Sequence, residues 1–179
     1  MKKEKELRNN IEWILTVTIL AFIISIVMGI FKELIVSNVG LIISIIITLI
    51  FIILGIIFDI IGVATTAANI HVFNSMASKK VKGAHLCVKL INNANKVSSV
   101  CCDVVGDVCG VASGSAGVSI AAILIKDFNM NILLVSTIVT AIISMFTIGG
   151  KAIGKGFAIK KSTSIVHKVG LILSKMGFK

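Results

Sequence analysis

Long apolar runs dominate this chain and alternate with short segments that carry lysines. A helix of about 20 apolar residues crosses the roughly 30 Å hydrocarbon core of a bilayer, so run length predicts membrane spans. Four runs are long enough: 11–31, 41–66, 97–125 and 130–150. Uninterrupted Ile, Leu and Val runs of this length fit helices rather than the alternating strands of a barrel. We therefore predict an all-α membrane protein with about four transmembrane helices.

The remaining segments are polar or amphipathic. Residues 1–10 form a basic N-terminus, and apolar positions recur at helical spacing in 69–93 and 151–179. This spacing predicts amphipathic helices that lie at the membrane interface, with Gly83 as a break in the first of them. The run 11–31 precedes a core of three spans and is expected to stay as an anchor, because no small-residue cleavage site follows it.

The basic residues indicate how the chain is oriented. The net charge is +10, and of the eighteen Lys and Arg residues only Lys32 and Lys126 fall outside the two ends and the segment between the second and third runs. The positive-inside rule then places both termini in the cytoplasm of a multi-pass protein of the cell membrane. Anionic lipid headgroups explain this charge better than a nucleic acid does, since no nucleic-acid-binding motif accompanies it.

Acidic residues inside the apolar runs are the main chemical signal. Asp59 and Asp107, with Asp103 one turn before Asp107, lie at similar depth near the inner ends of their runs, and Gly150 and Lys151 end the fourth run. A carboxylate at membrane depth costs at least about 2.5 kcal/mol, so it usually marks a functional site. The carboxylates could bind a cation through their oxygens, or Lys151 could neutralise one of them in a structural pair.

Small residues line one face of the third run, where Gly106, Gly110, Gly114 and Gly117 recur. Small residues four apart allow another helix to approach closely in lipid. The pattern predicts helix packing, either within one protomer or across a homodimer. The same glycines, next to Asp107, could also leave backbone open to an ion.

Several motifs resemble the membrane domain of the cyclin M and CorB/CorC magnesium transporters. The resemblance covers roughly residues 55 to 176, and its motifs follow one another in the family's order. The motifs that carry it are Gly83-Ala84, Lys89-Leu90-Ile91, Gly106-Asp107 and the segment GGKAIGKGFA at 149–158.

The resemblance implies a homodimeric transport or efflux protein for Mg²⁺ or another cation. Asp59 stands where the family has a ligand Ser, Asp107 where it has Asn, and Lys151 where it has Glu. Lys155 matches the family lysine, and Gly154 replaces the proline. The nucleotide-sensing CBS pair that usually follows in the family is not in this sequence, so its regulation is not implied.

Two other classes of function remain open. The Lys151 substitution favours a degenerate family member that does not transport and instead binds lipid or a partner. Asp59 and Asp107 also resemble the paired aspartates of an intramembrane protease, but the Pro-Ala-Leu element cannot occur without proline. No histidine lies in a span to support a serine mechanism. We expect no enzyme activity and no organic cofactor.

The four cysteines show no zinc-site spacing and lie in no oxidising compartment. We interpret Cys87, Cys101, Cys102 and Cys109 as small buried residues. Cys101 and Cys102, near the inner interface, are also candidates for reversible palmitoylation.

Overall fold

The computed structural model describes residues 2–36, 40–128 and 131–177. Within these ranges every element is a helix, and no strand occurs. The predictions that fall on Met1, Met130, Phe178 and Lys179 lie outside the described residues. The elements are, in chain order, α1 (Lys2–Val36), α2 (Leu41–Ala67), α3 (Ile70–Ser78), α4 (Ala84–Asn92), α5 (Ala94–Ser98), the π-helix η1 (Ser99–Gly106), α6 (Asp107–Phe128), α7 (Ile132–Lys160) and α8 (Ser162–Lys175).

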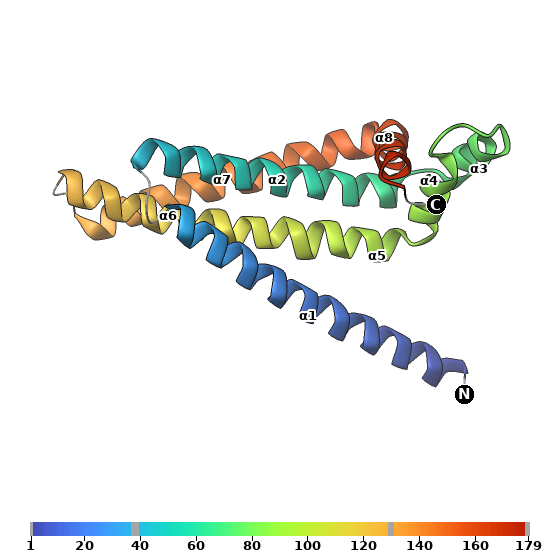
Figure 1. Ribbon diagram of the computed structural model, residues 1–179, viewed down its shortest axis with the longest axis horizontal. Coiled ribbons are helices and arrows are strands. Elements are labelled where there is room, and N and C mark those ends of the chain that lie inside the picture. Colours follow the sequence, from blue (N-terminus) through green and yellow to red (C-terminus); the bar gives the residue numbers. More distant parts are fainter. Residues whose placement is uncertain (1, 37–39, 129–130, 178–179) are drawn as a thin grey trace.

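Four helical segments are long and apolar enough to cross a membrane: Ile11–Phe31, Leu41–Ala67, Ala94–Lys126 and Ile132–Lys160. The third consists of α5, η1 and α6, which follow one another without a break (Figure 1). The predicted all-α fold is confirmed, and the chain is a multi-pass membrane protein.

The fourth helix is longer than the sequence analysis predicted. We placed its end at Gly150 and an amphipathic tail over 151–179, whereas α7 continues to Lys160 and α8 alone forms a separate helix. Gly150 lies inside α7, at the point where α7 packs on α2. A Cβ at this position would collide with the Ile56 side chain.

The helices α2, α6 and α7 pack closely together, while α1 lies at the periphery against α6 and η1. Figure 1 shows that the C-terminal end of α1 lies against the bundle and that α1 diverges from the bundle toward its own N-terminal end. Both termini lie at the end of the bundle that carries α3, α4 and α8. This arrangement agrees with an even number of membrane crossings. Among the α1 side chains that the structure describes, the partly buried ones share one stripe: Trp13, Val17, Ala21, Ile24 and Met28.

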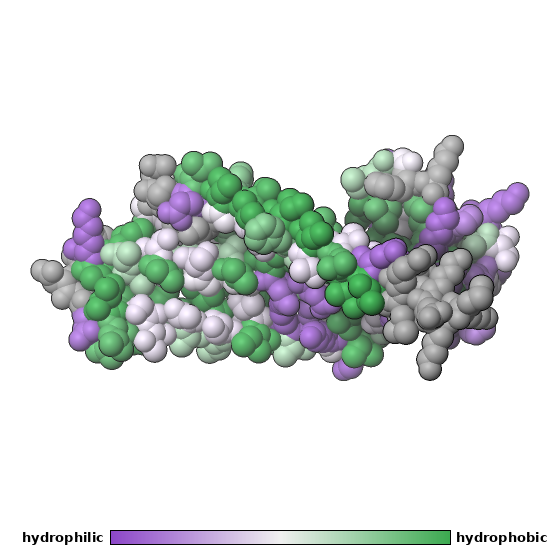
Figure 2. All heavy atoms as spheres, turned by 90° about the horizontal axis from the view of Figure 1, so that it is seen from below, coloured by the Kyte–Doolittle hydropathy of each residue, from purple (hydrophilic) through white to green (hydrophobic). Residues whose placement is uncertain are grey.

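The surface is largely apolar, as expected of helices that face lipid. Large hydrophobic side chains are exposed along α1, α2 and α7. Figure 2 shows that hydrophilic side chains gather toward the end that carries α3 and α4, and that another hydrophilic patch interrupts the apolar surface at mid-length. A hydrophilic patch at mid-length is unexpected on a helix bundle that faces only lipid.

The helices α3, α4 and α8 form a small cap on the end of α2. Phe73, Cys87 and Val166 are buried in its core. Gly83 separates α3 from α4 and has a φ of +79°, in the left-handed region that favours glycine, so the predicted break is confirmed. Gly83 also lies so close to Gly170 of α8 that neither position has room for a Cβ. Burial raises the pKa of the Cys87 thiol, which donates a hydrogen bond to the Val166 carbonyl at 3.3 Å.

Candidate functional site: two lysine–aspartate pairs

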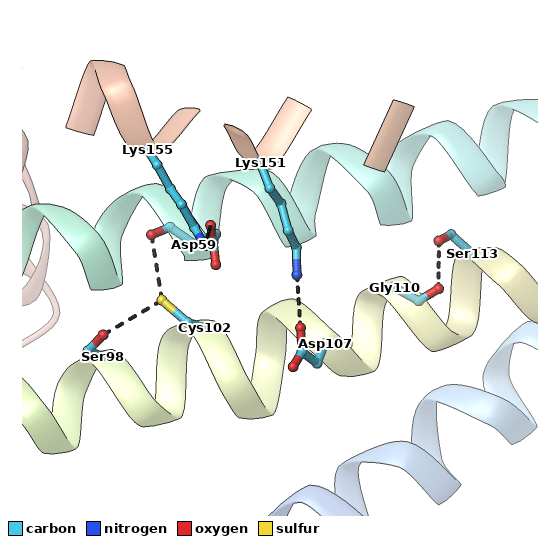
Figure 3. Close-up of polar contacts among 8 residues, drawn as sticks. All are labelled: Asp59, Ser98, Cys102, Asp107, Gly110, Ser113, Lys151 and Lys155. Atoms are coloured by element: carbon cyan, nitrogen blue, oxygen red, sulfur yellow. Dashed lines mark hydrogen bonds and ion pairs between the residues drawn. The ribbon is translucent and has the colours of Figure 1, made fainter. Parts of the chain in front are cut away.

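Two lysines of α7 reach two aspartates on neighbouring helices (Figure 3). The Lys151 Nζ lies 2.9 Å from Asp107 Oδ1, and the Lys155 Nζ lies 3.8 Å from Asp59 Oδ2. Residues four apart share a helix face, so both lysines leave α7 on the side that faces α2 and α6. Each of these two carboxylates therefore has its own counter-charge.

The Asp59 side chain is buried in the middle of the helix packing. It is 4% exposed, and its Oδ2 atom has no hydrogen-bond partner. Lys155 is 54% exposed and its ammonium group is too far from Oδ2 for a hydrogen bond. The charge of Asp59 is thus compensated by a lysine that can move into solvent or headgroups, while one carboxylate oxygen stays unsatisfied.

In the second pair the lysine is the buried partner. The Lys151 side chain is 18% exposed and that of Asp107, at the start of α6, is 68% exposed. A Cβ at Gly106 would lie 3.2 Å from the Cys101 carbonyl oxygen, 3.6 Å from that of Gly55 and 3.7 Å from the Lys151 Nζ. The ammonium group therefore lies near Gly106 and two backbone carbonyl oxygens, at the tightly packed crossing of α2 and η1.

The π-helix η1 lies directly before Asp107 and extends from Ser99 to Gly106. The Asp107 backbone N–H donates to the Cys102 carbonyl oxygen, five residues earlier. Such i→i+5 turns are rare, and they occur frequently at functional sites. This element was not predicted from the sequence, because an apolar run with Gly106 at its end gives no local signal for a π-helix.

A groove runs along α6 and α7 from the Asp107–Lys151 pair, and both polar and aliphatic side chains line it. Its volume is about 450 Å³, and its lining includes Gly110, Gly114, Ser144 and Thr147. From Ser144 it continues into a second hollow of about 360 Å³. That hollow is lined by Ser136, Thr137, Thr140, Ala141 and Ser144.

The threonine hydroxyls of the groove and of the second hollow donate to carbonyl oxygens of their own helix. Thr147 donates to the Ile143 carbonyl at 2.8 Å, and Thr140 to the Ser136 carbonyl at 2.8 Å. Thr137 likewise donates to its own helix, at 2.7 Å. Because each of these O–H protons is used within α7, the oxygen lone pairs remain for a cation or for water.

The predicted glycine face divides into two parts. Gly106 and Gly117 are packed within the protomer, where a Cβ at Gly117 would collide with Ile143. Gly110 and Gly114 have nothing within 4 Å of where a Cβ would lie, and they border the open groove. Close packing inside the protomer thus uses the ends of the glycine run, and its middle is left open.

The three predicted aspartate ligands are not brought into one cluster. Asp103 is exposed and belongs to neither lysine pair. Among the residues that the structure describes, no three His, Cys, Asp or Glu side chains are placed to hold a metal ion. In the sequence, only the match to a family motif singles out Lys155, although its spacing of four from Lys151 also predicts both lysines on one helix face.

The cysteines occupy helix contacts. Cys109 packs against Gly55, and the Sγ of Cys102 takes the space that a Cβ at Gly62 would need. All four thiols are free. Cys87 and Cys109 are buried, as the interpretation of small buried residues requires, whereas Cys101 and Cys102 are only partly buried.

Comparison of the chain with protein-family models, with curated proteins and with solved structures finds no match. The resemblance to the magnesium transporters therefore stays a prediction from the sequence motifs.

Proposed function

We propose that this membrane protein transports divalent cations of the magnesium type and that the Asp107–Lys151 pair is its binding centre. The observation that carries the proposal is the groove on α6 and α7, whose acceptor oxygens lead to a carboxylate that already holds a cationic group. Carboxylate, hydroxyl and carbonyl oxygens are the ligands that Mg²⁺ prefers. The motif resemblance supports the same function.

In this proposal Lys151 takes the place of the cation when the site is empty. An unpaired carboxylate within the membrane is costly, so the tethered ammonium group keeps Asp107 neutralised until a cation arrives. The incoming ion displaces Lys151 and gains the oxygens around Gly106, including the carbonyls of Cys101 and Gly55. The adjoining π-helix supplies irregular backbone beside a cavity, where such backbone is tolerated in membranes.

A second candidate function is a membrane protein that does not transport and instead binds lipid or a partner. The 2.9 Å contact between Asp107 and a largely buried Lys151 favours this candidate, because such a pair can be a permanent link between helices. The two candidates differ in whether a cation can displace Lys151.

We place the protein in the cell membrane with both termini in the cytoplasm, on the lysine distribution. We also propose a homodimer through the open Gly110 and Gly114 surface. A second copy would cover the exposed Asp107 side chain and close the groove into a path shielded from lipid.

The test is magnesium-dependent thermal unfolding of the purified protein in detergent. Millimolar Mg²⁺ should raise the unfolding temperature of the wild type, because a ligand stabilises the state that binds it. The Asp107→Asn variant should lose this shift. Asp103→Asn is the matched control, since it removes the same charge from an exposed side chain one turn away, and it should keep the shift. Equal shifts in all three proteins would contradict the proposed centre.

A further inference from the structure

The only tryptophan of the chain contacts a lysine of the third span. The Lys96 Nζ of α5 lies 4.9 Å from the centroid of the Trp13 ring of α1. An ammonium group at this distance is attracted by the face of the ring, which holds the lysine in place. Lys96 is exposed, and among the residues that the structure describes it meets no carboxylate. Its positive charge is therefore positioned by Trp13 and remains available for an anion.

A polar hollow lies beside this lysine, at the turn between α4 and α5. Its volume is about 290 Å³, and it is lined by Ile91, Asn92, Asn93, Ala94, Asn95 and Lys96. The Asn93 amide donates within the turn, to the Lys89 carbonyl at 3.0 Å, whereas the side chains of Asn92 and Asn95 are exposed. Each asparagine amide carries two N–H donors, and no acidic residue is among those that line the hollow. The hollow thus offers neutral donors and one positive charge, which suits an anionic group.

The hollow lies where two membrane spans begin. The first span begins at Ile11 and the third at Ala94, and both start at the end of the bundle that carries the two termini (Figure 1). Tryptophan is enriched at this depth, because its amphipathic ring suits the headgroup region. With the orientation proposed above, this end faces the cytoplasmic leaflet, where anionic lipids give the membrane surface a negative potential.

Apolar side chains adjoin Trp13 on α1. Ile14 and Leu15 are 61% and 57% exposed, and they continue the apolar surface of α1 into the hydrocarbon region. The packing partners of α1 are α6 and η1, and Figure 1 shows α1 diverging from the bundle toward its N-terminal end. Trp13 and Lys96 therefore connect α1 to α5 through two long side chains rather than through close helix packing.

We infer that Trp13, Lys96 and the hollow of Asn92 and Asn95 form a binding site for one anionic phospholipid. The headgroup phosphate pairs with Lys96 and accepts hydrogen bonds from the asparagine amides, and the acyl chains pack along the exposed apolar side chains of α1. The bound lipid links α1 to the bundle where the helices themselves have separated. The site includes neither Asp107 nor Lys151, so it does not depend on the proposed transport.

The test uses the fluorescence of Trp13, to which no other tryptophan contributes. The full chain is reconstituted into phosphatidylcholine bilayers that contain increasing amounts of phosphatidylglycerol with brominated acyl chains, because bromine quenches a tryptophan that it contacts. Brominated phosphatidylcholine is the zwitterionic comparison. In the wild type, quenching by the anionic lipid should saturate, and its apparent affinity should exceed that of the zwitterionic lipid by about fivefold, the contribution expected of one lysine.

Three variants show whether Lys96 carries this preference. Lys96→Met should abolish it, and Lys96→Arg should keep it, since arginine retains both the charge and the attraction to the ring. Lys161→Met is the matched control, because the Lys161 Nζ lies 5.5 Å from the Phe157 ring centroid and the change removes the same charge and the same kind of contact elsewhere. It should keep the preference.

Several results would overturn the inference: equal quenching of the wild type by the two lipids, a preference unchanged in Lys96→Met, or a preference lost equally in Lys161→Met. Excess inorganic phosphate should leave the quenching unchanged. Reversal by phosphate would indicate a site for a free anion and would likewise contradict a phospholipid site. Loss of magnesium transport with the lipid preference intact would contradict the proposed function alone.

Discussion

The contact between Gly62 of α2 and the third span gives a sharp test of how the bundle packs. A Cβ at Gly62 would overlap the Cys102 Sγ, and it would also lie 3.2 Å from the Cys101 Cβ and 3.4 Å from the Ser98 Cα. Rotating the Cys102 side chain would relieve only the first contact. The helices would have to move apart in Gly62→Ala.

The destabilisation expected for Gly62→Ala can be estimated by comparison with a matched control. Overfilling a packed contact typically costs about 1–3 kcal/mol, and replacing a helical Gly by Ala offsets about 1 kcal/mol of this. Gly149 of α7 has nothing within 4 Å of an added Cβ, so Gly149→Ala has the same gain without the collision. The difference between the two variants should therefore be about 1–3 kcal/mol, with Gly62→Ala the less stable.

The assay is reversible unfolding in mixed micelles, followed by circular dichroism as SDS is added. Cys102→Ala should restore part of the stability of Gly62→Ala, because it removes the overlapping sulfur, and a double-mutant cycle measures this coupling. A Gly62→Ala protein as stable as Gly149→Ala would show that α2 and η1 do not approach each other as described.

Three other predictions concern the surface, the cap and the orientation. Gly114→Leu should weaken the proposed homodimer, measured by crosslinking in detergent, while Gly29→Leu, on α1, should leave it intact. A wild type that is monomeric at every concentration would contradict the homodimer. Burial raises the pKa of Cys87 above its ordinary value of 9.0, so its thiolate should be scarce at pH 8 in the folded protein. Maleimide should then label Cys87 far more slowly than in the SDS-unfolded chain, and equal rates would contradict a buried thiol. A reporter fused after Lys179 should be active in the cytoplasm, and periplasmic or extracellular activity would reverse the orientation.

The sequence predicted those features that depend on local pattern. In lipid a long apolar segment must satisfy its own backbone hydrogen bonds and so forms a helix, which is why run length predicted the four spans. Gly83 could be predicted as a break because glycine tolerates a positive φ. The continuation of α7 past Gly150 was not predictable in this way. In a sequence, a glycine that ends a helix cannot be distinguished from one, such as Gly150, that packs against a side chain of a neighbouring helix, here Ile56.

The sequence identified residues of the candidate site but not which lysine pairs with which aspartate. Asp59, Asp107 and Lys151 were identified because charges are rare in apolar runs. Which lysine meets which aspartate depends on the rotation and offset of α7 against α2 and α6, and the chain carries no local signal for either. The same holds for the glycines: Gly106 packs inside the protomer and Gly110 faces open space, although both belong to one repeat.

The central claim is that a cation displaces Lys151 from Asp107, and magnesium flux into proteoliposomes tests it most directly. The wild type should move Mg²⁺ down an imposed gradient, Asp107→Asn should abolish the flux, and Lys160→Met, which removes a lysine of α7 outside both pairs, should retain it. Lys151→Glu should bind Mg²⁺ more tightly, because it adds a carboxylate where the ammonium group was. Wild-type flux no greater than that of empty liposomes, or flux unchanged by Asp107→Asn, would contradict the account; flux that appears only in Lys151→Glu would identify a protein whose transport the Lys151 pair has disabled.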